Sequence, residues 1–362
     1  MMMKSKIQVG VLGATGMVGQ NYIRLLENHP WFQVSFLAAS PRSAGKKYGE
    51  AVAGRWLVEG EIPEQAAKLT LNSVHETKAA AEVCDFVFSA FNLDKQEVRK
   101  LEAQYAEQMP VISNNSAHRL TEDVPLIIPE INPHHLQIIP SQQRNRGWDK
   151  GFIIVKPNCS IQSFLPPVSA LIEAGYPVES LVVSTLQAVS GAGFPGLAAL
   201  DMIDNVIPFI PGEEEKSERE PLKILGSIKD DKFVDLDSLI LSVHCNRVPV
   251  SHGHMATVSL KFRERIPTLQ EIKAIWESFE GIPQQLNLPS APLPLIVVRN
   301  EIDRPQPAKD RDAGNGMAIS VGRLRECPLL DIRFVALSHN TVRGAAGGAI
   351  LSAELLKAKG YL

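Results

Sequence analysis

The 362-residue sequence contains few cysteines and no long apolar segment. Its cysteines, Cys84, Cys159, Cys245 and Cys327, are widely spaced and form no C-x-x-C pair, which excludes a zinc knuckle and a disulfide framework. No run of about 18 apolar residues occurs, so we expect no transmembrane helix. The N-terminus shows no signal-peptide cleavage pattern. These absences favour free thiols in a reducing cytoplasm, with no metal site.

The sequence also lacks an excess of charge of either sign. Its formal net charge of −3 is too small to indicate binding to nucleic acid or to a membrane. Hydrophobic residues make up 44% and charged residues 21%, as in ordinary soluble enzymes. At about 150 residues per domain, the length predicts two domains with a core large enough to need no disulfide or metal.

Apolar runs alternate with helix-like segments in the first 150 residues. Helical spacing is clear at 20–29 and 94–108. The predicted strands are residues 7–12, 32–38, 84–91 and 109–115. This alternation predicts a parallel sheet with crossover helices, and therefore an α/β domain.

Longer strand-like segments follow residue 150 and predict a second, α+β domain with a mixed or antiparallel sheet. Its strands are expected at 181–190, 239–250 and 255–262. The charged segment 212–220 is interpreted as a loop or a helix start. Residues 340–360 predict a long helix whose small residues allow close packing against another element.

The glycines of "GATGMVG" follow the first predicted strand and precede the first predicted helix. Gly13, Gly16 and Gly19 form G-x-x-G-x-x-G, and this position makes the motif informative. Glycines allow backbone N–H groups to approach a pyrophosphate at the helix N-terminus. The segment therefore predicts a dinucleotide site, and the alternative is a tight turn without a ligand.

The region after the second strand distinguishes NAD from NADP. An NAD site has an acidic residue there for the ribose 2′-OH. This chain instead has Ser40, Arg42 and Ser43, followed by two lysines, and no acid before Glu50. Cations and hydroxyls suit a 2′-phosphate, so the segment favours NADP over NAD, and the alternative is a solvated basic loop without a ligand.

Cys159 lies in "VKPNCSIQSF", between an apolar run and a predicted helix. A thiol nucleophile needs a lowered pKa, which a helix N-terminus or a histidine can supply. Pro166 and Pro167 predict that this helix kinks or starts late. Cys84 and Cys245 lie in strand patterns and are interpreted as structural. The residues alone leave open whether Cys159 is a nucleophile or a small core residue.

Two histidines accompany an arginine in "CNRVPVSHGHM". Arg247, His252 and His254 lie within eight residues, around a predicted turn. A single histidine is more often a structural residue than a catalytic base. Because an arginine and a cofactor loop accompany these histidines, a structural role and a role as catalytic base are equally favoured here.

Six segments in order, "GATGMVG", "PNCS", "LQAVSGAG", "IDNVIPFIPGEEEK", "HCNRVPVSHGH" and "NTVRGAAGGAIL", resemble the aspartate-β-semialdehyde dehydrogenases. The resemblance covers essentially the whole chain and is closest to the fungal and archaeal branch. "PNCS" separates this family from acetylglutamyl-phosphate reductases and glyceraldehyde-phosphate dehydrogenases, which look like Gly-Cys-Tyr and Ser-Cys-Thr at this point.

The resemblance implies a role for each matching residue. It makes Cys159 the nucleophile, His254 the acid/base, and Gln187 the residue that orients the acyl intermediate. His252 falls where the branch often has an acid, so His254 is the favoured histidine. The substrate and phosphate contacts that it implies are Arg247 for the carboxylate, Glu213 for the amine, Lys216 and Arg119 for phosphate, and Asn158 beside the thiol.

The resemblance also extends the predicted cofactor site and fixes the domains. The expected NADP(H) contacts are Gly13, Thr15, Gly16, Met17, Val18, Gly19, Ser40, Arg42, Ser43, Ser89, Ser190, Gly191 and Asn340. The Rossmann-type domain is expected at 1–157, completed by the C-terminal helix 340–362. The catalytic and oligomerisation domain is expected at 158–339, in a homodimer or homotetramer.

The implied activity is reversible, phosphate-dependent oxidation of aspartate β-semialdehyde to β-aspartyl phosphate, through a Cys159 thioester with NADP. His254 is expected to help form the thiolate and to remove the hydroxyl proton. Two alternatives stay open. One is a malonyl-CoA reductase on the same scaffold, and the other is a dinucleotide-binding regulatory protein without catalysis.

Overall fold

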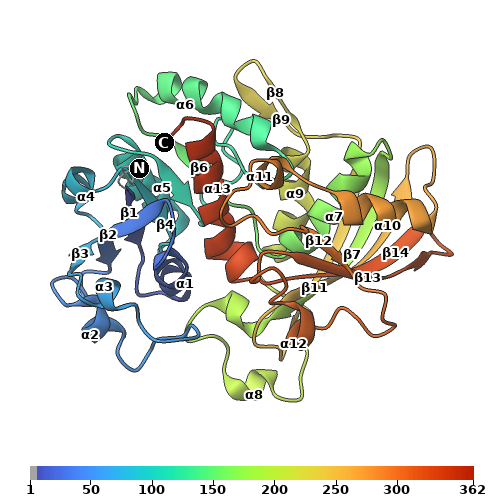
Figure 1. Cartoon of the computed structure of the whole chain (residues 1–362), viewed down its shortest axis with the longest axis horizontal. Helices are drawn as coiled ribbons and strands as arrows, with labels where there is room; N and C mark the ends of the chain where they lie inside the picture. Colours follow the sequence, from blue (N-terminus) through green and yellow to red (C-terminus); the bar gives the residue numbers. More distant parts are fainter. Residues whose placement is uncertain (1–5) are drawn as a thin grey trace.

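The computed structural model describes residues 6–362 and contains two six-stranded sheets (Figure 1). All strands of the first sheet are parallel. Its order is β3-β2-β1-β4-β5-β6. The strands are β1 (Ile7–Leu12), β2 (Phe32–Ala39), β3 (Leu71–Ser73), β4 (Phe86–Ser89), β5 (Val111–Ser113) and β6 (Ile153–Val155). The order reverses between β1 and β4, as in dinucleotide-binding sheets, which confirms the Rossmann-type prediction.

Crossover helices connect these strands. They are α1 (Met17–Leu26), α2 (Tyr48–Val52), α3 (Glu64–Ala67), α4 (Thr77–Val83), α5 (Lys95–Ala106), the 3₁₀ helix η1 (Pro133–Ile138) and α6 (Ile139–Arg146). The Asp94 carboxylate caps α5 by accepting from the N–H groups of Gln96 and Glu97. The strands predicted at 84–91 and 109–115 are shorter than expected, because pairing extends over four and three residues only.

The second sheet is mixed, as predicted, in the order β10-β7-β11-β14-β13-β12. The β10–β7 and β12–β13 pairs are parallel and the other pairs antiparallel. The strands are β7 (Val178–Ala188), β10 (Ile240–Val248), β11 (His254–Phe262), β12 (Ile296–Val298), β13 (Ile319–Glu326) and β14 (Ile332–Ser338). A separate hairpin joins β8 (Ser227–Lys229) to β9 (Lys232–Val234).

Helices cover one face of the mixed sheet. The helices of this part are α7 (Ile161–Glu173), the 3₁₀ helix η2 (Val189–Ala192), α8 (Ala199–Met202), α9 (Glu213–Ile224), α10 (Leu269–Ser278), α11 (Ile282–Gln285) and α12 (Pro307–Asp310). Both α7 and α10 contact the sheet from this face. The charged segment 212–220 is the start of α9 and not a loop, because three glutamates in its first turn complement the helix dipole.

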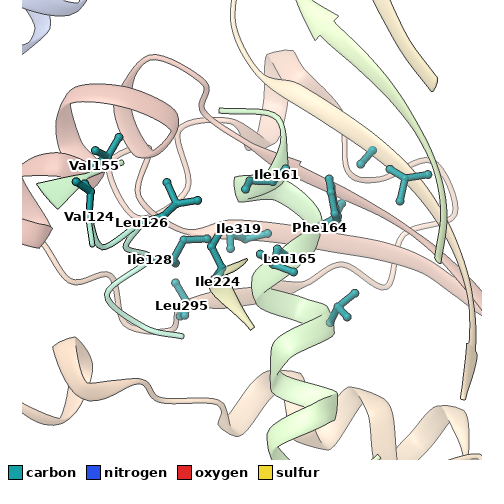
Figure 2. Packing of buried hydrophobic residues seen from close by; sticks show 14 of the residues in the cluster. Val124, Leu126, Ile128, Val155, Ile161, Phe164, Leu165, Ile224, Leu295 and Ile319 are labelled. Atoms are coloured by element: carbon teal, nitrogen blue, oxygen red, sulfur yellow. The ribbon is translucent and has the colours of Figure 1, made fainter. Parts of the chain in front are cut away.

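Helix α7 runs through the middle of the core. Figure 2 shows Ile161, Phe164 and Leu165 of α7 among apolar side chains of both sheets. All residues from Ile161 to Leu171 are buried, so the helix is enclosed by protein on every side. The prediction of a late start is wrong, since α7 begins at Ile161 and contains Pro166 and Pro167. Tertiary packing outweighs the two lost helical hydrogen bonds.

The C-terminal helix packs against the first sheet and its helices (Figure 1). Its first turn is a π-helix, η3 (Val342–Ala346), and the α-helical part is α13 (Gly347–Ala358). These two helical segments contact α1, and α13 also contacts β5. Arg343 also donates to Glu130 at 2.9 Å, and both side chains are buried.

Residues 6–362 offer neither a helix of membrane-spanning length and hydropathy nor a cluster of metal ligands. No helix in this range is both long and apolar enough to cross a bilayer. The same residues contain no group of three or more His, Cys, Asp or Glu side chains placed to hold a metal ion.

Candidate functional site

The glycine loop after β1 is built by close backbone contacts. A Cβ at Gly13, whose φ is +83°, would lie 2.3 Å from the Ala90 carbonyl oxygen, and a Cβ at Gly19 would lie 2.3 Å from the Gly13 oxygen. Both positions therefore require glycine. A Cβ at Gly16 would lie 3.4 Å from the Gly13 oxygen, which is a less severe contact, and Gly16 lines a cleft.

The cleft fits a dinucleotide. It has a volume of about 550 Å³ and lies at the carboxyl ends of the parallel strands, where such ligands bind. Its walls include Gly13, Thr15, Gly16, Met17 and Val18 of the predicted site. The N-terminus of α1 has no side-chain cap, so its N–H groups are available to a pyrophosphate.

The predicted 2′-phosphate residues occupy one turn after β2. Ser40 lines the cleft, Arg42 is exposed beside it, and Ser43 is buried, with its N–H donating to the Ser40 oxygen at 2.9 Å. Arg55 also lines the cleft. Sequence reasoning missed it because it lies beyond α2, away from the second strand.

Ser89 does not present its hydroxyl to the cleft. The residue is fully buried and donates to the Glu102 carboxylate at 2.6 Å, as Ser113 does from the next strand. The Asn115 amide also donates to Glu102, at 3.0 Å. This buried carboxylate therefore connects the ends of β4 and β5, and the hydroxyl predicted to meet the cofactor takes part in that connection.

The other predicted cofactor residues lie where the second domain approaches the cleft. Asn340 donates to the Ser190 hydroxyl at 2.8 Å and accepts from the Gly253 N–H at 2.8 Å. Directly after Ser190 and Gly191 in the chain, Ala192, Gly193 and Phe194 line the cleft. Asn340 therefore positions the loop that follows β7.

The turn between β6 and α7 holds the thiol. The Asn158 side-chain oxygen accepts from the Ser160 N–H at 2.8 Å and from its hydroxyl at 2.9 Å. These bonds fix Cys159 directly before the first turn of α7. Gly344 of η3 packs on the other side, where a Cβ would lie 2.8 Å from the Cys159 Cβ.

Helix α9 presents Glu213 and Glu220 to this turn. Glu213 accepts from the Asn158 amide at 2.9 Å and pairs with Lys216 at 2.8 Å. Glu220 accepts from the Asn158 N–H at 2.6 Å and from Arg119 at 2.9 Å. The structure thus selects Glu213 as the glutamate that faces the thiol.

Glu214 and Glu218 point elsewhere on the same helix. They accept from the N–H groups of Cys245 and Val243 on β10, each at 3.0 Å. These bonds satisfy the edge strand of the mixed sheet.

Three strands bring the remaining predicted residues together. Gln187 on β7 lies opposite Arg247 on β10, and His254 begins the neighbouring strand β11. Gln187 donates to Glu213 at 3.4 Å, and Arg247 donates to the Ala188 oxygen at 2.7 Å. A Cβ at Gly191 would lie 2.8 Å from Arg247 and 3.1 Å from His254, so glycine lets both side chains approach this point.

The two histidines of "SHGH" separate. The Nδ1 atom of His254 accepts the Ala188 N–H at 3.1 Å, and its Nε2 has no partner within the described residues. His252 instead stacks on His339, with ring centroids 5.4 Å apart. His254 is therefore the histidine at the site.

Burial controls the pKa values of this site. It raises the pKa of Cys159 to about 11, and the Glu213 charge adds to this, while Lys156, Arg119 and Arg247 act in the opposite sense. Burial and then Arg247 lower the pKa of His254 to about 3. The histidine is therefore neutral at physiological pH.

Sequence reasoning missed Lys156 and Glu220. Lys156 is 3% exposed, and burial lowers its pKa to about 7. A lysine inside the apolar run "FIIVKPNCS", three residues before the thiol, was the available signal. Glu220 gave none, because only the fold brings it to Arg119.

A dinucleotide-binding sheet, joined to a domain that gathers a thiol, an arginine and a histidine, is typical of nicotinamide-dependent dehydrogenases with an active-site cysteine. Two family models that match the chain describe dehydrogenase domains. Residues 8–139 match the model "Semialdehyde dehydrogenase, NAD binding domain", and residues 168–343 match "Semialdehyde dehydrogenase, dimerisation domain". The second match supports a homo-oligomer.

Archaeal and fungal relatives that are 42–47% identical to this chain are named aspartate-semialdehyde dehydrogenase. The one from Archaeoglobus fulgidus is 47% identical over 97% of this chain and 98% of its own length. The one from Saccharomyces cerevisiae is 42% identical, over 99% of this chain and 100% of its own. The Candida albicans enzyme, solved with NADP, superposes with a TM-score of 0.90 at 40% identity, covering 99% and 100% of the two chains.

The chain therefore belongs to the semialdehyde dehydrogenase family. The resemblance to its fungal and archaeal members is confirmed. The malonyl-CoA reductase and the non-catalytic regulatory protein are not favoured by any of these matches.

Proposed function

We propose that this protein is an aspartate-semialdehyde dehydrogenase, which interconverts aspartate β-semialdehyde and β-aspartyl phosphate. One observation carries the proposal. Glu213 contacts Asn158, Gln187 and Lys216 beside the Cys159 turn, which gathers the predicted amine, acyl and phosphate contacts around one thiol. The relatives at 42–47% identity bear the same enzyme name.

The cleft of the first domain would hold NADP, which would supply the hydride acceptor for oxidation of the substrate carbon. The glycine loop and the N-terminus of α1 hold its pyrophosphate. Ser40, Arg42 and Arg55 provide the hydroxyl and the positive charges for the 2′-phosphate, and β2 ends without a carboxylate that would oppose it. The Candida albicans relative was solved with this cofactor.

Cys159 attacks the aldehyde carbon as a thiolate, and the carbonyl oxygen becomes an oxyanion. His254 donates its Nε2–H to this oxygen. We assign the proton to Nε2 because Nδ1 already accepts the Ala188 N–H. This differs from the expectation that His254 removes a proton, since thiolate addition yields the oxyanion directly. Such a donor is worth about 3 kcal/mol in comparable enzymes.

A thioester on Cys159 remains after the substrate carbon is oxidised. Gln187 orients this acyl group, and Arg247 binds the substrate carboxylate with a guanidinium fork that suits a planar anion. Arg119 and Lys216 place the phosphate that attacks the thioester. Each is paired with a glutamate that accepts a hydrogen bond from Asn158, the neighbour of the thiol, which supports this role.

The homo-oligomer is proposed to be a dimer formed through the uncovered face of the mixed sheet. Helices contact the opposite face, and the free face carries Val182 and Ile240, which are 47% and 68% exposed. Light scattering on the purified protein separates a dimer from a tetramer. We also propose a reducing, cytoplasmic location, because the four cysteines are free.

The activity is tested by mixing purified protein with aspartate semialdehyde, NADP and phosphate. Phosphate-dependent formation of NADPH supports the proposal. Failure of this reaction, together with NADPH oxidation by malonyl-CoA, would replace it by the rival reductase.

A further inference from the structure

Lys156 is a buried cation that the proposed reaction does not use. It follows β6 directly and lies three residues before Cys159. Its Nζ atom donates to the Pro157 oxygen at 3.4 Å, and it forms no ion pair among residues 6–362. A buried ammonium group without a carboxylate is costly, so its presence beside the thiol requires an explanation.

The C-terminal helix contacts Lys156 and Cys159 with one face. Gly344 and Gly348 are four residues apart and therefore lie on the same side of this helix. A Cβ at Gly344 would lie 2.8 Å from the Cys159 Cβ, and a Cβ at Gly348 would lie 2.6 Å from the Lys156 Cε. The two glycines thus let the thiol and the lysine pack side by side under one helix.

The other charged groups near the thiol are almost all paired. The charged groups that act on Lys156 are Cys159, Arg119, Arg343 and Glu220. Those that act on Cys159 are Glu213, Lys156, Arg119 and Arg247. The ion pairs among and beside them are Arg119–Glu220, Arg343–Glu130 and Lys216–Glu213. Within the described residues, Lys156 and Arg247 remain as cations without a carboxylate partner.

His254 cannot serve as the positive partner of the thiolate. Burial and Arg247 lower its pKa to about 3, so it carries no charge at neutral pH. Arg247 is assigned to the substrate carboxylate. Among the three cations that lower the pKa of Cys159, Lys156 has the largest effect.

We propose that Lys156 is a positioning residue whose ammonium charge stabilises the Cys159 thiolate. The proposal rests on the proposed function, in which Cys159 is the nucleophile. The thiol releases its proton to solvent, and Lys156 keeps its own proton because the new negative charge stabilises the ammonium form. Cys159 and Lys156 therefore ionise as a pair, while the neutral His254 stays a hydrogen-bond donor to the substrate oxygen.

The test is the pH dependence of iodoacetamide alkylation at Cys159 in the full-length protein, followed by mass spectrometry of its peptide. Lys156→Met removes the charge and keeps most of the side-chain volume. We expect the midpoint of the alkylation profile to rise by about one pH unit, so that alkylation at neutral pH slows about tenfold. Lys100→Met, at an exposed lysine of α5, is the matched control and should leave the midpoint unchanged.

Thermal unfolding separates this electrostatic role from a structural one. Because Lys156→Met removes a buried charge that lacks a carboxylate partner, the melting temperature should stay the same or rise. A lowered melting temperature with an unchanged alkylation midpoint would overturn the proposal. Lys156→Gln gives the same readout if the methionine variant does not fold.

The failure of this proposal is distinguishable from failure of the proposed function. If Cys159→Ala retains dehydrogenase activity, the thiol is not the nucleophile and both fail. If Cys159→Ala is inactive while Lys156→Met alkylates like the wild type, only the role of Lys156 is wrong.

Discussion

The Asn158 amide donates to the Glu213 carboxylate at 2.9 Å and connects the turn that holds the thiol to the first turn of α9. Although burial acts in the opposite sense, Lys216 and these hydrogen bonds lower the pKa of Glu213, so it is ionised at neutral pH. This negative charge opposes formation of the thiolate until a substrate amine arrives. The same carboxylate therefore restrains the thiol and recognises the substrate.

Glu213→Gln should make the Cys159 thiol more reactive toward alkylation and should raise KM for the substrate. Removing the negative charge lowers the pKa of Cys159, so alkylation at neutral pH should accelerate. The lost charge-assisted bond to the substrate amine is worth about 1.5–3 kcal/mol, which raises KM at least tenfold. Glu214→Gln is the matched control, because Glu214 binds the Cys245 N–H instead. Slower alkylation in Glu213→Gln would contradict this account.

His254→Ala should reduce kcat about 10²–10³-fold, as expected for loss of one oxyanion donor. His254→Gln should retain part of the activity, because its amide can still donate. Since burial lowers the pKa of His254 to about 3, the wild-type profile of kcat/KM should show no histidine limb between pH 5 and 8. A limb near pH 6.5 that disappears in His254→Gln would show that the histidine acts as a base.

Glu130→Ala should destabilise the protein by about 3–5 kcal/mol, because it leaves the buried Arg343 charge without its partner. Chemical unfolding measures this loss. Glu122→Ala breaks the exposed pair with Lys232 and should cost at most about 1 kcal/mol. Equal losses in the two variants would mean that the C-terminal helix is not held by the buried pair.

Arg42→Ala should lower kcat/KM with NADP roughly tenfold and leave the value with NAD unchanged, because the proposed role of the guanidinium is to bind the 2′-phosphate, which NAD lacks. Arg55→Ala should act in the same direction, since Arg55 lines the same cleft. Lys68→Ala, at an exposed position directly after α3, is the control. A wild-type NADP/NAD ratio near one would show that this turn does not select the cofactor.

Sequence patterns predicted those elements whose conformation depends on neighbouring residues in the chain. The glycine loop between β1 and α1 needs a positive φ at Gly13 and close contacts at Gly19, and the sequence displays both glycines at the expected spacing. Strand β3 was missed because it has three residues, and β12, β13 and β14 because long-range pairing determines them.

The candidate site was predicted in part for the same physical reason. Cys159, Arg247 and His254 have chemical types that point to a reaction, and their motifs allowed them to be selected. Glu220 and Lys156 depend on which helix packs against the thiol turn, so only the fold brings them into the site. Ser89 was misplaced because nothing in its neighbourhood in the chain predicts the buried Glu102 that accepts its hydroxyl.

The most direct test of the central claim is a single-turnover experiment without phosphate, using enzyme, aspartate semialdehyde and NADP. If Cys159 carries the reaction, one equivalent of NADPH should form per active site, and mass spectrometry should find the acyl group as a thioester on the Cys159 peptide. Adding phosphate should then release it as acyl phosphate. Continuous NADPH formation without phosphate, or a burst in Cys159→Ala, would contradict the account.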